Sequence, residues 1–198
     1  MLNSTVKIKK LLESKNMILD FGVSNERILE IEKKINFVFP PDLRDLLMNF
    51  VPRGFHKQDA GFPDWNNEPI ESLSKRFDVF TESVIFDITN NNFWYSKWGK
   101  KPEAINDRVN LAKDKLKTEP KPIPIYLHRC MLSQPNIIGN PILSIYQTDM
   151  IFYGNDLYDY FKNEFGGDKI NMNLSDPKLK LDNFWLNVIW GKKEGKKL

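Results

Sequence analysis

The residues of the sequence best suited to nucleophilic or metal chemistry are His56, His128 and Cys130. His128 and Cys130 are two residues apart in a segment typical of a β-strand, so we expect their side chains on one face of that strand. With His56 they would provide three ligands for zinc, or Cys130 would act as a nucleophile and His128 as its base. The sequence contains no CxxC or HxxxH spacing, however, and an isolated cysteine in a strand is usually a small core residue. We therefore expect neither a metal site nor a cysteine nucleophile.

Three carboxylates raise the alternative of acid–base chemistry: Asp64 in FPDW, Asp149 in QTDMIFYG and Glu164 in NEF. An acid–base pair requires two groups whose surroundings separate their pKa values, and the sequence places no two of these side chains together. We interpret Asp64 and Asp149 as turn residues and Glu164 as a residue on a helix surface. A hydrolase that uses Asp149 or His128 stays as an alternative. It requires an activity that Asp149→Asn or His128→Ala abolishes while the fold stays intact.

Nucleotide and nucleic-acid binding receive little support from the sequence. It has no GxGxxG and no GxxxxGK[ST] motif, and the net charge is only +3, from 29 basic and 26 acidic residues that are mixed along the chain. The aromatic clusters NFWYSKW and NFWLNVIW could stack on bases, but a stacking surface normally accompanies a basic groove. We expect these clusters to pack in the core or against a protein partner. The sequence predicts no catalytic residue and no cofactor.

The 198 residues are 41% hydrophobic and 13% aromatic, which is sufficient for the core of one domain that spans residues 1–198. No apolar run approaches the roughly 20 residues that cross a bilayer, and the N-terminus interleaves lysines with apolar residues, unlike a secretory signal. A single cysteine suits a reducing compartment. We therefore expect a soluble cytoplasmic protein. We expect the basic tail GKKEGKKL, residues 191–198, to be disordered.

The N-terminal half is predicted to be helical. A short helix is expected near the N-terminus, and a clearer one begins after Ser24 or Asn25, which would cap it. The segment NFVFPP then stops this helix, because the residue before a proline avoids the α region, and Pro41 suits the first turn of the next helix. We interpret NFVFPP as a buried elbow between two amphipathic helices. The loop that follows carries Phe55, Phe62 and Trp65 and is expected to pack against the body.

Further helices are expected from Pro69 towards DITN and over residues 103–117. After Pro122 the pattern changes to β-branched and aromatic residues bounded by Pro and Gly, which is typical of strands. The first such segment is PIPIYLHR. The second, PILSIYQTDMIFYG, forms either one bent strand or two strands with a turn at QTD. Asn155 or Asp156 would cap a helix through LYDYFKNEF, and LDNFWLNVIW forms the last amphipathic segment. This order predicts an α+β domain in which helices of the N-terminal side and the middle pack on a mixed or antiparallel sheet.

The segment ILEIEKKINFVFPPDLRDLLMNFVPRG resembles the opening signature of the SUKH superfamily, which includes fungal cell-wall-assembly regulators and many bacterial proteins. In that family a helix containing IE precedes a Leu-Pro-x-Asp/Glu element, a second helix and a glycine. The corresponding positions here are Glu32, Phe39, Pro40, Asp42, Leu43, Leu46 and Gly54. PIPIY resembles a strand that the family usually writes IPI, and SIYQTDMIFYGNDLYDYFKNEF resembles its later strand pair and the following helix. The resemblance covers residues 25–165 in islands that keep the order of the family.

Two segments depart from the family pattern. The helical insertion between FPDW and PIPIY is longer than in the smallest members. The segment LHRCMLSQPN stands where many members have a short glycine-rich hairpin. These departures affect the surface that would meet a partner more than they affect the fold.

The resemblance implies a non-catalytic protein-binding module. Bacterial members are similar to immunity proteins that bind and neutralise a cognate toxin, often a nuclease or a deaminase, whereas others act as scaffolds. Such a role needs a rigid frame that presents aromatic anchors and a few charges. We expect the contact surface around HRC and QTDMIFYG, with a contribution from the FPDW loop. The candidate partner-binding residues are Trp65, His128, Arg129, Asp149 and Tyr153.

Overall fold

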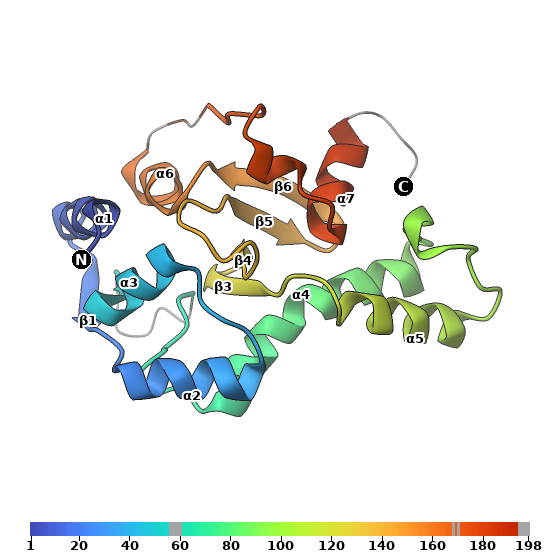
Figure 1. The fold of residues 1–198 in the computed structure, drawn as a ribbon, viewed down its shortest axis with the longest axis horizontal. Coiled ribbons are helices and arrows are strands. Elements are labelled where there is room, and N and C mark those ends of the chain that lie inside the picture. The colour runs from blue at the N-terminus through green and yellow to red at the C-terminus, as the bar shows by residue number, and fades with distance from the viewer. Residues whose placement is uncertain (56–60, 168, 170, 194–198) are drawn as a thin grey trace.

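A four-stranded antiparallel sheet lies at the centre of the molecule, with helices against both of its faces (Figure 1). The structure is a computed structural model that describes residues 1–55, 61–167, 169 and 171–193. The strands follow one another as a meander in the order β3-β4-β5-β6. Their bounds are β3 Pro122–Tyr126, β4 Arg129–Leu132, β5 Ile142–Tyr146 and β6 Asp149–Gly154. A second, smaller sheet consists of β1 Ile18–Phe21 and β2 Phe50–Gly54.

Most helices precede the central sheet in the chain. These are α1 Asn3–Ser14, α2 Asn25–Ile35, α3 Pro41–Asn49, α4 Ile70–Asn90, the 3-10 helix η1 Ser96–Trp98, and α5 Ile105–Leu116. After the sheet follow α6 Leu157–Phe161, its π-helical continuation η2 Lys162–Gly166, the 3-10 helix η3 Pro177–Lys180, and α7 Phe184–Lys193. Among the described residues, no helix combines the length and the apolar character that crossing a membrane requires.

The elbow between α2 and α3 forms where the sequence predicts it, but it is only partly buried, because Val38 is 54% exposed. Ser24 caps α2, where its hydroxyl accepts a hydrogen bond from a backbone N–H of the first turn at 3.2 Å. Asn36 ends α2 in the left-handed conformation, and α3 begins at Pro41. Phe39 between them is 1% exposed, and its N–H donates to the Glu32 carboxylate at 3.0 Å. Apolar burial and a hydrogen bond back to α2 therefore hold the elbow.

Each face of the central sheet has its own apolar core, because side chains alternate along a strand. On β4, Met131 belongs to one core, while Cys130 and Leu132 belong to the other. The first core involves α1, α2, α3, the start of α4, and α6, and its members include Ile8, Ile31, Leu46, Phe77, Ile123, Met131 and Phe161. The second core involves the rest of α4, α5 and α7, and its members include Phe80, Ile88, Trp98, Cys130, Leu143, Phe152 and Trp185.

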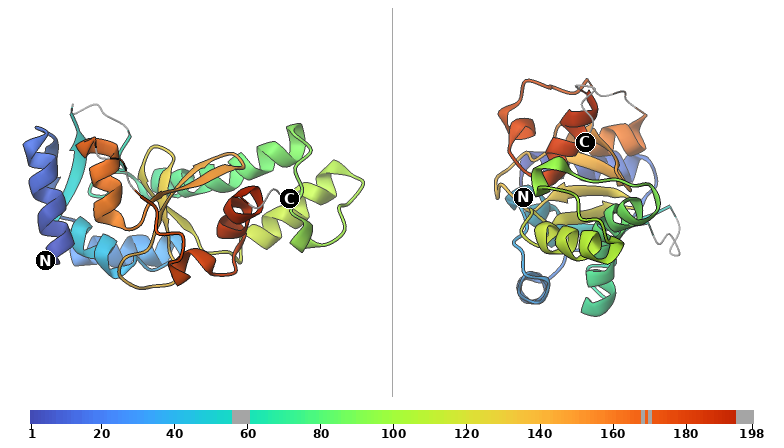
Figure 2. Two further views of the ribbon diagram at one scale, coloured as in Figure 1. Left: turned by 90° about the horizontal axis from the view of Figure 1, so that it is seen from above. Right: turned by 90° about the vertical axis from the view of Figure 1, so that its right-hand side faces the viewer.

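Helix α4 joins the two cores. Its first turns contribute Leu73 and Phe77 to the first core, and its later turns contribute Phe80, Val84 and Ile88 to the second core. Seen from above, the N-terminal helices lie at one end of an elongated molecule, and α5 with the C-terminal part of α4 lies at the other end (Figure 2). Because the two cores share one sheet and one helix, the chain is a single α+β domain.

The α+β class expected from the sequence is confirmed, and both sheets are antiparallel. A turn separates β5 from β6, so PILSIYQTDMIFYG contains two strands. The sequence prediction missed the β1–β2 sheet. It also placed residues 191–193 in a disordered tail, whereas they continue α7 to Lys193. Residues 194–198 of that tail lie outside the described residues.

Candidate partner-binding surface

The structure places four of the five candidate partner-binding residues on one face of the central sheet. They are His128, Arg129, Asp149 and Tyr153. The strand register explains this placement, because Arg129 on β4 lies opposite Ser144, and Ser144 lies opposite Ile151 on β6. Tyr146, two residues after Ser144, lies opposite Asp149. Residues opposite one another in an antiparallel pair share a face, so this set lies on the face of the first core.

Arg129 is the centre of a polar network on this face. Its Nε donates to Oε2 of Glu164 at 3.2 Å, and its Nη1 donates to Oγ of Ser144 at 3.0 Å. Its guanidinium carbon lies 3.8 Å from the centroid of the Tyr153 ring, which is a cation–π contact, and Nη1 also contacts Nε2 of His128. The side chains of Arg129 and Glu164 are only 13% and 17% exposed. The network therefore fixes three strands to η2 and places a counter-charge beside the partly buried guanidinium.

Two titrating groups near Arg129, His128 and Tyr160, have pKa values that are shifted towards their neutral forms. Burial lowers the pKa of His128, and the positive charge of Arg129 lowers it further, while Glu164 acts in the opposite direction. The imidazole is therefore neutral at neutral pH. Burial also raises the pKa of Tyr160 well above its usual value. The Tyr160 hydroxyl is enclosed and has no hydrogen-bond partner within the described part of the chain.

Three large apolar side chains are exposed at the two turns above this network. Leu127 is 61% exposed, Tyr146 is 65% exposed and Ile151 is 48% exposed. The ring centroid of Tyr146 lies 6.1 Å from that of His128, and Asp149 is exposed beside them at the start of β6. We refer to Leu127, His128, Tyr146, Asp149 and Ile151 as the hairpin-tip surface. A group of exposed apolar residues with a polar rim is typical of a protein contact site.

His128 and Cys130 do not share a face, contrary to the expectation from the sequence. Leu127 has a φ of 50°, which belongs to a turn, and His128 is part of that turn and not of β4. The His128 ring contacts Tyr146, whereas Cys130 is fully buried in the second core, where burial raises the pKa of its thiol. Within the described residues no three His, Cys, Asp or Glu side chains form a metal site. His56 lies outside the described residues.

The prediction that Trp65 binds a partner is wrong, because its side chain is buried. It is 3% exposed and lies in the first core, with its ring centroid 5.3 Å from that of Phe39 and 6.3 Å from that of Phe77. Its carbonyl accepts a hydrogen bond from Arg27 Nε at 3.3 Å. The expectation that its loop packs against the body holds at Phe62 and Trp65 but not at Phe55, which is 47% exposed. The packing at Trp65 removes the indole from the surface.

The remaining carboxylates have structural partners. Asp64 is a turn residue, as interpreted from the sequence: it accepts a hydrogen bond from the Asn67 N–H at 3.2 Å and pairs with Arg53 Nη1 at 2.8 Å. Glu164 differs from its interpretation as a residue on an open helix surface, because it forms the partly buried pair with Arg129. An ion pair between residues 35 positions apart leaves no periodic signal in the sequence.

Sequence reasoning also missed Leu127, Tyr146 and Ile151. Strands buried on both faces have nearly continuous apolar sequences, and Ile151 stands between two buried residues, Met150 and Phe152. Nothing in such a run marks the position that the helices leave uncovered. The one available signal is the position of Leu127 and Tyr146 next to the turns, because apolar residues at turns are often exposed.

Comparisons with known proteins found no match: no family model, no curated protein and no solved structure is similar to this chain. The geometry of the hairpin-tip surface and the motifs of the sequence are therefore the grounds on which a function is proposed. One of these motifs, SIYQTDMIFYG, forms the end of β5, the turn and β6, and so contributes Tyr146, Asp149 and Ile151 to this surface.

Proposed function

We propose that this chain is a non-catalytic protein-binding module of the SUKH type, which acts as an immunity protein by binding and neutralising a cognate toxin. The observation that carries the proposal is the hairpin-tip surface. Its three exposed apolar side chains lie above a partly buried ion pair. A partner that covers this surface gains apolar burial, the charge of Arg129 stays compensated by Glu164, and the fixed strands lose little conformational entropy on binding.

The surroundings of His128 support a non-catalytic role. A general base needs a nucleophile within hydrogen-bonding distance, usually with a third group that orients the base. In the described residues, His128 contacts Arg129 and Tyr146. Arg129 is a permanent cation that disfavours a proton on the imidazole, so it opposes the role of His128 as a base. A hydrolase that depends on His128 is therefore less well supported than a binding module.

A general scaffold or regulatory protein of the same fold would use the same surface, so the two roles differ only in the partner. Growth rescue distinguishes them. The chain is co-expressed with a toxin encoded by a neighbouring gene, and the surviving fraction is measured with the wild type and with Tyr146→Asp/Ile151→Asp. The matched control is Val79→Asp/Phe86→Asp on α4, because these two apolar residues are 60% and 49% exposed and the variant introduces the same charge.

We expect the wild type and the α4 control to restore growth and the hairpin-tip variant to fail. Loss of a contact centre worth about 2 kcal/mol weakens the complex by roughly 30-fold. Circular dichroism of the purified variants establishes that both keep the fold. Rescue by the hairpin-tip variant would reject this surface. Absence of rescue by the wild type, with a stable complex to a protein that is not a toxin, would favour the scaffold role.

A further inference from the structure

A groove lies beside the α2–α3 elbow and the segment that connects α5 to β3. It consists of two adjoining hollows of about 710 Å³ and 230 Å³, which share Lys117, Pro120 and Lys121. The elbow lines the larger hollow with Phe37 and Val38, and Val38 is 54% exposed. An exposed aliphatic side chain beside two lysines gives this hollow both an apolar and a cationic part.

The walls of the groove are fixed by hydrogen bonds that link distant segments. The Lys121 N–H donates to Oγ of Ser133 at 2.9 Å, and the Ser133 N–H donates back to the Lys121 carbonyl at 2.9 Å. Nδ2 of Asn136 donates to the Phe39 carbonyl at 3.1 Å, which ties the β4–β5 loop to the elbow. The groove is therefore formed before any ligand arrives, so binding costs little conformational entropy of the protein.

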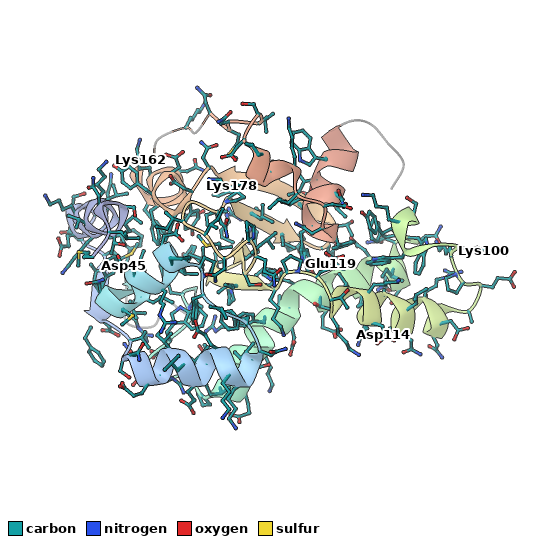
Figure 3. The ribbon with its side chains drawn as sticks, viewed as in Figure 1. Asp45, Lys100, Asp114, Glu119, Lys162 and Lys178 are labelled. Carbon is teal, nitrogen blue, oxygen red and sulfur yellow. The ribbon has the colours of Figure 1, made fainter. Side chains whose placement is uncertain are left out.

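The positive charges of the larger hollow have no strong partners. Glu119 is the only carboxylate on its wall in the described part of the chain, and Oε2 of Glu119 accepts the Phe184 N–H at 2.9 Å. Lys117 pairs with Asp114 at 2.9 Å, but these side chains are 74% and 70% exposed, so the pair contributes little. Glu119 lies beside the end of the sheet and Asp114 lies further out on α5 (Figure 3). Lys121 forms no ion pair within the described residues.

The charge changes along the groove. Lys33 and Lys34 in the last turn of α2 are exposed and precede the elbow by a few residues, so they add positive potential at the larger hollow. The smaller hollow carries Asp78 and Glu82 of α4, and Glu82 pairs with Lys113 at 3.2 Å. The end at the elbow is therefore cationic, whereas the end at α4 is mixed.

We propose that this groove binds an extended peptide segment of another protein in which acidic and apolar side chains alternate. In an extended segment successive side chains point to opposite sides. Carboxylates would then face Lys117 and Lys121, while the intervening apolar side chains pack on Phe37 and Val38. The groove begins at the Pro122 end of β3, and the hairpin-tip surface lies beyond the Tyr126 end of the same strand. The two sites are therefore separate, and this inference does not rest on the proposed function.

The test measures binding of labelled probes to the purified full chain by fluorescence polarisation. The main probe is a fluorescein-labelled octapeptide in which glutamate alternates with leucine. The same peptide with lysine in place of glutamate, and a single-stranded DNA of similar charge, serve as comparisons. The variant is Lys117→Glu/Lys121→Glu, and the matched control is Lys10→Glu/Lys15→Glu, which changes the net charge equally at exposed positions of the N-terminal region.

We expect the acidic peptide to bind with a Kd between about 1 μM and 1 mM and the lysine peptide to bind at least about tenfold more weakly. The groove variant should weaken binding at least about tenfold, the control by less than about twofold, and added salt should weaken it moderately. Equal binding of both peptides, equal loss in both variants, or tighter binding of the DNA would overturn the proposal. Tyr146→Asp/Ile151→Asp should leave peptide binding unchanged, so failure here and failure of the immunity role are distinguishable.

Discussion

The two faces of the central sheet differ in how completely the helices cover them. On the second-core face of β4, β5 and β6, the strand side chains are apolar and buried along the whole length: Cys130, Leu132, Leu143, Ile145, Met150 and Phe152. On the first-core face, Ile123, Met131 and Ile142 are buried, whereas Tyr146 and Ile151 at the other end are exposed. The position of the hairpin-tip surface therefore follows from where the helices stop, and not from residue type alone.

The two faces are also closed by different means. Helix α7 covers the second face with apolar side chains, and hydrogen bonds anchor its start: the Phe184 N–H donates to Glu119, and Trp185 Nε1 donates to the Pro120 carbonyl at 2.8 Å. The apolar cover of the first face ends at the Arg129–Glu164 pair. One face is closed by hydrophobic packing to its edge, and the other is closed by a polar network that leaves a surface free for a partner.

The largest expected effect comes from opening the second face. Trp185 is 1% exposed in the second core, so Trp185→Ala should lower the free energy of unfolding by about 3–5 kcal/mol. Phe161 is fully buried in the first core, and Phe161→Ala should cost a similar amount. Urea unfolding, followed by circular dichroism and by tryptophan fluorescence, measures the change in the free energy of unfolding for both variants. The control Phe86→Ala, at a 49% exposed position, should change stability by less than about 0.5 kcal/mol.

The same measurement tests whether the two cores are one cooperative unit. Because the sheet and α4 belong to both cores, we expect one transition that is coincident for both probes in the wild type and in each variant. Two separate transitions in Trp185→Ala, with the first core still folded at the denaturant concentration that unfolds the second, would show that the two faces are independent.

A smaller effect is expected from the polar end of the first face. Glu164→Gln leaves the Arg129 guanidinium without its counter-charge, which should cost about 1–3 kcal/mol of stability. A double-mutant cycle with Arg129→Gln should give a coupling free energy of about 0.5–3 kcal/mol. The comparison is the Lys97–Asp182 pair, which has an N–O distance of 2.7 Å but side chains that are 57% and 81% exposed. Its coupling should not exceed about 1 kcal/mol, and equal coupling in both cycles would contradict the structural role of the Arg129 network.

The helices and turns could be predicted from the sequence because their signals are local. Ser24, Pro41 and Asp156 mark helix starts by the hydrogen bonds or fixed dihedral angles that they supply. The β1–β2 sheet was missed because β1 has only 4 residues and its partner is about 30 residues away, so neither strand has a local signal strong enough to overrule its helical neighbours.

The candidate site was only partly predictable, for a related reason. His128, Arg129, Asp149 and Tyr153 were grouped from their proximity to the strand motifs, and strand register does bring them together. Burial of Trp65 could not be predicted, because an aromatic residue in a loop has the same local sequence signal whether it packs inward or faces a partner. Exposure depends on contacts between distant segments, which a single sequence does not display.

The smallest effect, and the one most specific to the open end of the first face, is a dependence of stability on pH through His128. Burial and the charge of Arg129 lower its pKa in the folded state, so between that value and the unfolded value of about 6.5 the unfolded chain binds more protons. Stability should therefore fall as the pH drops below about 6.5 and should not change through this group above it. His128→Gln should remove that part of the dependence, by less than about 1 kcal/mol because the ring is partly exposed. Urea unfolding of both proteins between about pH 7.5 and pH 5 isolates the contribution of His128, because the two proteins differ only at that residue. Parallel stability curves, or a wild type that gains stability in acid, would mean that the imidazole is not held against the guanidinium. The polar closure of the first face would then consist of the Arg129 contacts with Ser144, Tyr153 and Glu164 alone.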